Sequence, residues 1–409
     1  MAGVRSIANV GSVLVFGVVV AACGSLPARS IAPTPTPIQT QPVPTATLVA
    51  VEPSEVESER APPTPSSTID VSQPSSFTVV PGALGPFDGW SPDGMHFIAN
   101  TSAGFGVLDR DAVLVTSVAA TDGYWVSANS VAAITATGSV VGPIRFYDLS
   151  GINTGQIPGK FEGLEVAPAG DIFAAVQVAT GGNAIGTTYR VWDTGSLSEV
   201  RDGVPLAWTP DASNLAVLVP LRGSGNGPPG EEGHVSIVAA SGATQLALRD
   251  WISDVFEPFV FSPDGHYLAA CVEDPNGKLP SMRVVDTQTA SVSNGVGTCG
   301  YATWTALDTL YSSFPSDGTH VWTPGSGVTD PGFPPQTVAV ASTDGKIASW
   351  SAAADDTLRV TIGTAVTDYV LSGDIEGVYW SPDGTRLLSV ATSHNASGFE
   401  LTVIRADGG

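Results

Sequence analysis

The sequence has little positive charge. Only 16 Lys and Arg stand against 39 Asp and Glu among 409 residues, which gives a formal net charge of −23. Proteins that bind nucleic acid neutralise phosphates with clustered Lys and Arg, and no such cluster occurs in this chain. The same acidic surface should repel anionic lipid headgroups. The composition therefore excludes a nucleic-acid-binding protein.

Residues typical of catalytic and metal sites are also scarce. The chain has three Cys and five His, and they form neither a paired-Cys spacing nor a His-Glu-x-x-His motif. No Gly-x-Ser-x-Gly elbow and no calcium-loop spacing of Asp and Asn is present. The sequence therefore predicts neither a metal site nor a bound cofactor.

The N-terminal apolar run is too short to cross a membrane. It extends from Val10 to Ala22 and is interrupted by Ser12 and Gly17, whereas a spanning helix needs roughly 20 apolar residues. A single charged residue, Arg5, precedes the run, and small residues end it. This layout is typical of a secretory signal.

The end of this run, Val20-Ala21-Ala22-Cys23, resembles the signal peptides of bacterial lipoproteins. The resemblance implies cleavage between Ala22 and Cys23 and a diacylglycerol thioether on Cys23. We therefore expect residues 1–22 to be a lipoprotein signal peptide and the mature protein to be lipid-anchored on the extracytoplasmic face of the cell membrane. Two alternatives stay open: an ordinary signal peptide with a chance cysteine, and an uncleaved anchor.

Residues 23–76 differ in composition from the rest of the chain. Thr, Ser, Gln and Glu alternate there with Pro33, Pro35, Pro37, Pro42, Pro44, Pro62, Pro63, Pro65 and Pro74. Such a segment cannot bury enough apolar surface to fold, and its prolines favour extended polyproline II. At about 3.1 Å per residue it would reach at most ~150 Å. We interpret it as a tether that acts as a spacer.

A short motif recurs in the remaining residues, 77–409. An aromatic residue comes before a Ser-Pro-Asp-Gly turn, and an apolar strand follows. The clear copies are Ser91-Pro92-Asp93-Gly94, Ser262-Pro263-Asp264-Gly265 and Ser381-Pro382-Asp383-Gly384, after Trp90, Phe261 and Trp380. Weaker copies have their Ser-equivalent at positions 127, 167, 209, 305 and 342. The motif thus predicts eight copies of one structural unit.

Each residue of the motif also has a structural role in the turn. Proline presets φ at the second turn position, Ser and Asp hydrogen-bond the local backbone, and Gly ends a tight type I turn between two strands. The eight origins lie 36 to 53 residues apart, close to the ~40–45-residue period of a four-stranded propeller blade. Because Asp and Trp recur once per unit, we assign them to the fold rather than to a site.

The turn and the strand pair after it resemble those of the TolB-like and WD40-like (PD40) β-propellers. The resemblance implies an all-β fold, a β-propeller over residues 77–409 with eight four-stranded blades. Seven blades remain an alternative if one weak copy is an insertion. The last unit stops one strand short after residues 399–405, so we expect residues 77–80 to supply the missing strand and close the ring.

Two further features are candidates for function or stability. Cys271 and Cys299 are expected to be neighbours, either as a disulfide or as two buried free thiols. The connection Pro220–His234 is the main source of the longest spacing. As a binding loop it would use Arg222, Asn226, Glu231, Glu232 and His234; a tolerated surface insertion is the alternative.

The favoured interpretation is a non-enzymatic binding or scaffold module. Its partner would be a protein, peptide or glycan of the cell envelope, bound on one propeller face. The alternative is an enzyme, a lyase or hydrolase, with its site in the central channel. The fold class does not choose between them, because propellers serve many roles.

Overall fold

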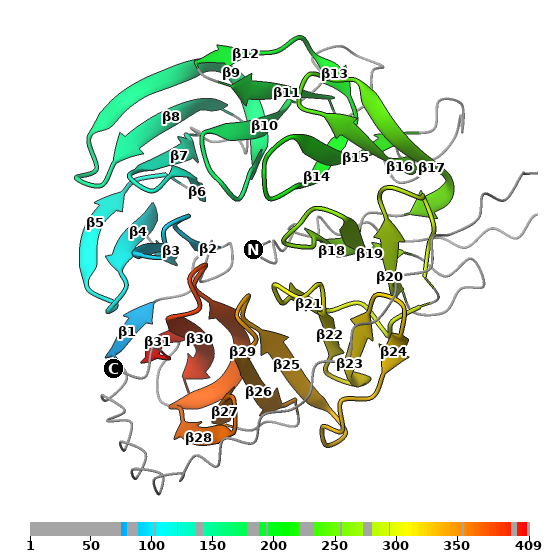
Figure 1. The fold of residues 1–409 in the computed structure, drawn as a ribbon. Coiled ribbons are helices and arrows are strands. Elements are labelled where there is room, and N and C mark those ends of the chain that lie inside the picture. The colour runs from blue at the N-terminus through cyan, green and yellow to red at the C-terminus, as the bar shows by residue number, and fades with distance from the viewer. Residues whose placement is uncertain are drawn as a thin grey trace, which may run out of the picture. The chain divides into compact units, whose positions relative to one another are not determined.

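The computed structural model describes residues 75–79, 89–101, 104–120, 122–135, 142–177, 188–193, 195–220, 233–253, 256–272, 280–293, 295–352, 356–393 and 399–406. All of them belong to one compact unit, and their regular structure consists of strands alone (Figure 1). In this part of the chain no helix has the length and apolarity to cross a membrane. The signal segment, Cys23 and residues 24–74 of the expected tether lie outside the described residues. Ser75 and Ser76, the last two residues expected in the tether, belong to a strand.

The strands of the first half are, in chain order, β1 (Ser75–Val79), β2 (Gly89–Trp90), β3 (His96–Thr101), β4 (Gly104–Asp109), β5 (Leu114–Val118), β6 (Asp122–Ser127), β7 (Ser130–Ile134), β8 (Gly142–Asp148), β9 (Asn153–Val166), β10 (Ile172–Gln177), β11 (Thr188–Asp193), β12 (Ser196–Leu197), β13 (Arg201–Asp202), β14 (Val204–Trp208), β15 (Asn214–Pro220), β16 (Gly233–Ala239) and β17 (Thr244–Ser253). Those of the second half are β18 (Phe256–Phe261), β19 (Tyr267–Val272), β20 (Ser281–Asp286), β21 (Tyr301–Trp304), β22 (Leu310–Phe314), β23 (Gly318–Thr323), β24 (Gly327–Thr329), β25 (Thr337–Ala341), β26 (Ile347–Ser351), β27 (Thr357–Ile362), β28 (Ala365–Val370), β29 (Gly373–Trp380), β30 (Arg386–Ser393) and β31 (Phe399–Arg405).

These strands form antiparallel sheets that follow one another along the chain. Sheets β2-β3-β4-β5, β14-β15-β16-β17, β21-β22-β23-β24 and β25-β26-β27-β28 have four strands each. All eight expected turns lie between the first and second strands of a unit, at β2/β3, β6/β7, β9/β10, β14/β15, β18/β19, β21/β22, β25/β26 and β29/β30. The motif therefore located the repeat units correctly along the chain.

The second and third units share one strand. β9 is 14 residues long; its first half pairs with β8 and its second half with β10. The two units therefore form one eight-stranded sheet. The sequence did not indicate this continuity, because Pro158-Gly159 in the middle of β9 is typical of a break between strands.

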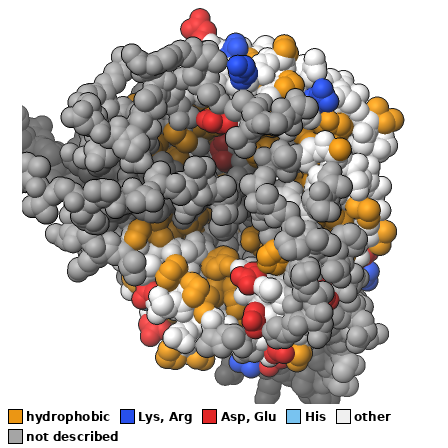
Figure 2. Space-filling model, turned by 180° about the vertical axis from the view of Figure 1, so that it is seen from behind, with side chains coloured by type: hydrophobic (Ala, Val, Ile, Leu, Met, Phe, Trp, Pro, Cys, Tyr) orange, Lys and Arg blue, Asp and Glu red, His pale blue; other side chains and the backbone are white. Residues whose placement is uncertain are grey.

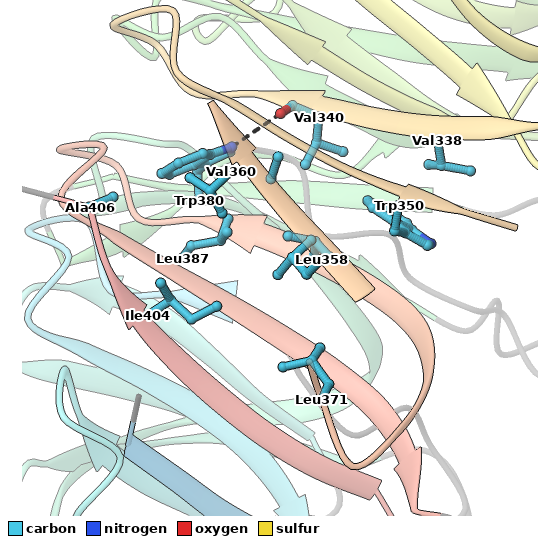
Figure 3. Close-up of a cluster of buried hydrophobic side chains, with 12 residues drawn as sticks. Val338, Val340, Trp350, Leu358, Val360, Leu371, Trp380, Leu387, Ile404 and Ala406 are labelled. Atoms are coloured by element: carbon cyan, nitrogen blue, oxygen red, sulfur yellow. Dashed lines mark hydrogen bonds between the residues drawn. The ribbon is translucent and has the colours of Figure 1, made fainter. Parts of the chain in front are cut away.

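The sheets are buried on both faces. Leu215, Ala216, Val217 and Leu218 are consecutive in β15 and are each at most 1% exposed. Because consecutive residues of a strand point to opposite faces, each face needs its own cover. Leu218 packs in a cluster with the following unit, and Leu215 packs in a cluster with the preceding one. Figure 3 shows such a cluster between strands β25–β27 and β29–β31.

The fifth unit departs from the expected four strands. Its sheet, β18-β19-β20, has three. Residues 291–293 and 295–299 run beside β20 as an irregular segment, with Met282 N–H donating to Gly297 O at 2.9 Å. At the end of this segment Cys299 forms a disulfide with Cys271 of β19, with Cα atoms 5.6 Å apart. Of the two alternatives left open above, the structure has the disulfide. It fixes the segment that takes the place of a fourth strand.

The strand ahead of the first turn joins the last unit. β1 pairs antiparallel with β31, with Ser75 opposite Val403 and Val79 opposite Phe399. It is the fourth strand of the sheet β1-β31-β30-β29. The strand covers residues 75–79 instead of the expected 77–80. It begins earlier because the seven residues of β31 also provide partners for Ser75 and Ser76. Val80 lies outside the described residues.

Deletion of residues 75–79 should lower the melting temperature by on the order of 5–10 °C and promote aggregation, because it exposes the unpaired edge of β31. Thermal denaturation followed by circular dichroism measures the effect. A deletion of equal length in the tether, residues 50–54, is the control and should leave the melting temperature unchanged. Equal melting temperatures for the two deletions would contradict a stabilising role for β1.

Candidate functional site

The turn at Ser91 shows how the repeat motif is built. Gly94 N–H donates to Ser91 O at 2.9 Å, as in a type I turn. The Ser91 hydroxyl donates to Asp93 Oδ1 at 2.6 Å and accepts the backbone N–H of His96 at 2.9 Å. Asp93 Oδ1 also accepts the backbone N–H of Met95 at 3.0 Å. The Ser and Asp side chains are therefore both used to hold the turn.

The other turns repeat this arrangement. We number the four turn positions one to four, from the Ser-equivalent to the Gly-equivalent. The hydroxyl at position one donates to the carboxylate at position three in Ser262–Asp264, Ser342–Asp344, Ser381–Asp383 and Thr209–Asp211. Position four has a φ between 54° and 87° at Gly94, Gly170, Ala212, Gly265, Asp308, Gly345 and Gly384. Glycine adopts this conformation without strain, which explains why it is the most frequent residue there.

These bonds also set the charge of the turn carboxylates. The hydroxyl of Thr209 and then the backbone N–H of Ser213 lower the pKa of Asp211. Burial raises the pKa of Asp383, but hydrogen bonds from Ser381 and Thr385 outweigh it and the net shift is downward. The pKa values of Asp264 and Asp344 are lowered in the same way against their burial. The repeat carboxylates are thus ionised acceptors within the turns.

The second unit has a different turn. β6 continues through Ser127, which pairs with Ser130 around Ala128 and Asn129. Trp125 lies two residues before the Ser-equivalent instead of one, and the pairing register shifts between Trp125 and Ser127. The copy at position 127 therefore departs from the Ser-Pro-Asp-Gly pattern before the turn itself begins. Its sequence has neither the proline nor the Asp that stabilise such a turn elsewhere.

Tryptophan side chains tie each of five units to the unit before it. Each donates its indole N–H to a backbone carbonyl two positions before the Ser-equivalent of the preceding unit. The five bonds are Trp90 to Tyr379 O (3.2 Å), Trp125 to Gly89 O (3.1 Å), Trp208 to Glu165 O (2.9 Å), Trp304 to Val260 O (3.0 Å) and Trp380 to Val340 O (3.1 Å). Trp90, in the first unit, thereby binds the last unit. The repeat predicted a structural role for the tryptophans, but it gave no sign of these bonds.

Several neighbouring turns also touch. We call the surface formed by the eight turns the turn face (turn residues 91–94, 127–130, 167–170, 209–212, 262–265, 305–308, 342–345 and 381–384). Asp171 N–H donates to Val126 O, and Ala306 N–H donates to Thr343 O. The Lys346 ammonium binds Asp344 of its own unit and Gly384 O of the next turn, at 2.5 and 2.9 Å. One of the three lysines is therefore used inside this surface.

The sixth turn, Thr305–Asp308, departs from the pattern at two positions. Leu307 occupies position three, where five other turns have Asp, and Asp308 occupies position four. The Leu307 side chain is 85% exposed, more than any other described large hydrophobic side chain. Elsewhere hydrophobic side chains reach the surface in separate groups among acidic ones, as on the face in Figure 2. Residue identities at these turn positions, once aligned, could have revealed this exception.

The remaining predicted site residues are only partly described. Arg222, Asn226, Glu231 and Glu232 of the expected binding loop lie outside the described residues, as do Ala22 and Cys23. His234 is the second residue of β16, where it pairs with Val219 and Ile252. Among the described residues no group of three or more His, Cys, Asp or Glu is arranged to hold a metal ion.

Comparison with known proteins shows the fold. No protein-family model and no curated protein matches the sequence. Among solved structures, the chain is similar to BamB from Moraxella catarrhalis (12% identity, 82% of this chain and 100% of that one, TM-score 0.50) and to the Dos1 propeller (11%, 81% and 94%, TM-score 0.51). TolB from Acinetobacter baumannii matches at a TM-score of 0.33, with 16% identity over 76% and 78% of the chains. The protein is therefore a β-propeller, as the motif resemblance implied, and at these identities the likeness concerns fold alone.

Substitution of Trp380 by Phe should destabilise the protein by about 1–3 kcal/mol beyond the loss of ring volume, because it leaves the buried Val340 carbonyl without its donor. Trp350→Phe is the matched control. Trp350 is buried in the same cluster, and its indole makes no hydrogen bond to the residues drawn in Figure 3. Equilibrium denaturation compares the two variants. Equal losses would show that the indole bond adds nothing to packing.

Proposed function

We propose that the protein is a lipid-anchored, eight-bladed β-propeller that binds a protein or peptide of the cell envelope through its turn face. It stands on the extracytoplasmic side of the membrane, held by lipidated Cys23 and the tether of residues 23–76. It acts as a binding or scaffold module and not as an enzyme. Of the three partner classes considered, a glycan fits an exposed aliphatic side chain least well.

Several contacts support eight blades in a ring closed by β1. Eight turns occupy equivalent places, although the second and third units share a sheet. Trp90 and Phe97 of the first unit pack with Leu388 and Leu401 of the last in one buried cluster. The Trp90 indole bond to Tyr379 O and the pairing of β1 with β31 add directional contacts at the same junction.

The observation that carries the binding function is Leu307. Asp at position three stabilises a turn by accepting two hydrogen bonds, as Asp93 does. Leucine at that position gives up these bonds and exposes an apolar side chain to water, which is unfavourable for the isolated protein. A partner that covers Leu307 would recover this free energy, since the burial of apolar surface is favourable.

The anchor is supported by the N-terminal motif and by charge. A chain with a formal charge of −23 has no electrostatic attraction to an anionic membrane. Stable attachment therefore needs acyl chains, and one chain holds a protein only marginally. A lipobox cysteine that receives diacylglycerol meets this requirement.

Replacement of Cys23 by Ala should move the protein from the membrane fraction to the soluble fraction after cell fractionation, because the lipid is the expected attachment. Ser25→Ala, two residues further on, is the control and should stay with the membrane. Intact mass spectrometry of the membrane-bound protein should show the added diacylglycerol. A Cys23→Ala protein that still resists high-salt extraction from membranes would contradict the lipid anchor.

A photo-reactive amino acid at position 307 of the anchored protein should give one discrete cross-linked adduct in intact cells. The control position is Val370 in β28, which is 76% exposed and lies outside the turn face. Mass spectrometry of the adduct would identify the partner and distinguish protein from glycan. The absence of an adduct at 307, or identical adducts at both positions, would contradict binding through the turn face.

A further inference from the structure

A short irregular segment lies where the fifth unit would have its fourth strand. We call residues 295–299 the strap. It runs beside β20, the last strand of the three-stranded sheet. Val296 N–H donates to Met282 O at 2.7 Å, and Met282 N–H donates to Gly297 O at 2.9 Å. The strap therefore occupies hydrogen-bonding groups at the edge of β20 without being a regular strand itself.

The strap also closes an apolar cluster between two units. Val296 is fully buried. Its cluster includes Met282 and Val284 of β20 and, from the sixth unit, Trp304 and Trp322. Because a buried apolar side chain must leave its cluster if the strap moves away, the strap and the packing of this junction are coupled.

A carboxylate of the sixth unit holds the strap from the other side. Thr298 N–H donates to Asp317 Oδ2 at 2.8 Å, and His320 Nε2 lies 3.2 Å from the same oxygen. Burial raises the pKa of Asp317, but the hydrogen bonds from Thr298 and the charge of His320 outweigh it, so the pKa is lowered overall. This contact is therefore intact at neutral pH and is lost only as the pH falls through the lowered pKa.

The covalent contact of the strap is the disulfide between Cys299 and Cys271 of β19, whose Cα atoms are 5.6 Å apart. Cys271 is fully buried, whereas Cys299 is partly exposed. A thiol that arrives from solvent therefore meets Cys299 first. Cleavage of this bond removes the strongest restraint on the strap and leaves the charges around it unchanged.

We propose that the strap is a redox-operated cover, which opens when a dithiol reductant cleaves the Cys271–Cys299 bond. One thiolate of the reductant attacks Cys299 Sγ and forms a mixed disulfide, and the Cys271 sulfur leaves as a thiolate that takes up a proton. The second thiol of the reductant then attacks the reductant's own sulfur in the mixed disulfide. Cys299 leaves as a thiolate and is protonated, and the reductant departs as a disulfide after giving up two electrons.

Opening of the strap changes one edge of the fifth unit. The hydrogen-bonding groups of Met282 lose their partners, and β20 becomes an uncovered edge of a three-stranded sheet. Such an edge accepts a further extended strand. The inference goes beyond the proposed function, since the strap is not part of the turn face and its opening does not depend on what that face binds.

The test is hydrogen–deuterium exchange of the full chain, measured by mass spectrometry with and without dithiothreitol at neutral pH. After reduction, peptides that cover residues 280–299 should exchange at least about tenfold faster, because the loss of the disulfide favours local opening. β15 of the complete fourth unit is the internal control, and its exchange should stay unchanged. In the reduced protein, iodoacetamide should modify Cys299 before Cys271.

A full chain that carries Cys271→Ser and Cys299→Ser is the matched variant. It should show the fast exchange of residues 280–299 without dithiothreitol and should not respond to its addition. Two results would overturn the redox-operated cover: unchanged exchange of residues 280–299 in wild-type protein whose two thiols are shown to be free, or an equal acceleration in β15. Both are read from the wild-type protein, so the test holds even if the variant does not fold.

Discussion

A buried indole needs an acceptor for its N–H, and in this protein the acceptor lies on the neighbouring unit. Each of the five bonds runs from a tryptophan beside one turn to a carbonyl of the first strand in the unit before. The requirement exists because the sheets are apolar on both faces and no unit can cover itself. Packing brings the units together, and the indole bonds fix how far one unit is displaced along the next.

The alignment of neighbouring units by their indole bonds also brings turns into contact and so creates the turn face. Where neighbouring units are aligned in this way, position four of one turn can meet position three of the turn before, as Gly94 meets Asp383 and Gly384 meets Asp344. Glycine and Asp are compatible at this contact, since one leaves the space that the other needs. Leu307 and Asp308 are exceptions to both rules within a single turn, which makes the sixth turn chemically different from the rest of the face.

Much of the fold follows from local sequence signals. The Ser-Pro-Asp-Gly turns and the apolar strands after them specify their own conformation, so the eight turn positions, the strand β31 and the core role of the tryptophans could be predicted. The features that the sequence did not predict depend on contacts between distant segments. The continuity of β9, the irregular segment held by Cys299 and the extension of β1 to Ser75 are decided by partners far along the chain.

The candidate site was less accessible to sequence reasoning. Length and composition drew attention to the connection Pro220–His234, because long loops often carry function. The sixth turn gave a weaker signal, since a degenerate copy of a repeat normally indicates relaxed structural constraint. Only the structure shows that Leu307 is exposed and that Asp308 adopts a φ of 54°. Comparison of equivalent positions between turns is the step that would have made both residues visible.

The pairing of β1 with β31 has a consequence for how the chain is made. Ser75 and Val403 lie opposite each other although 328 residues separate them in sequence, and contacts between such distant segments form late and slowly. Until Phe399–Arg405 has left the ribosome, Trp90, Phe97 and Leu108 of the first unit have no partner from the last. A chain that is truncated or stalled before that point carries an uncovered apolar surface at its N-terminal unit. Such a surface is the kind that chaperones and proteases recognise.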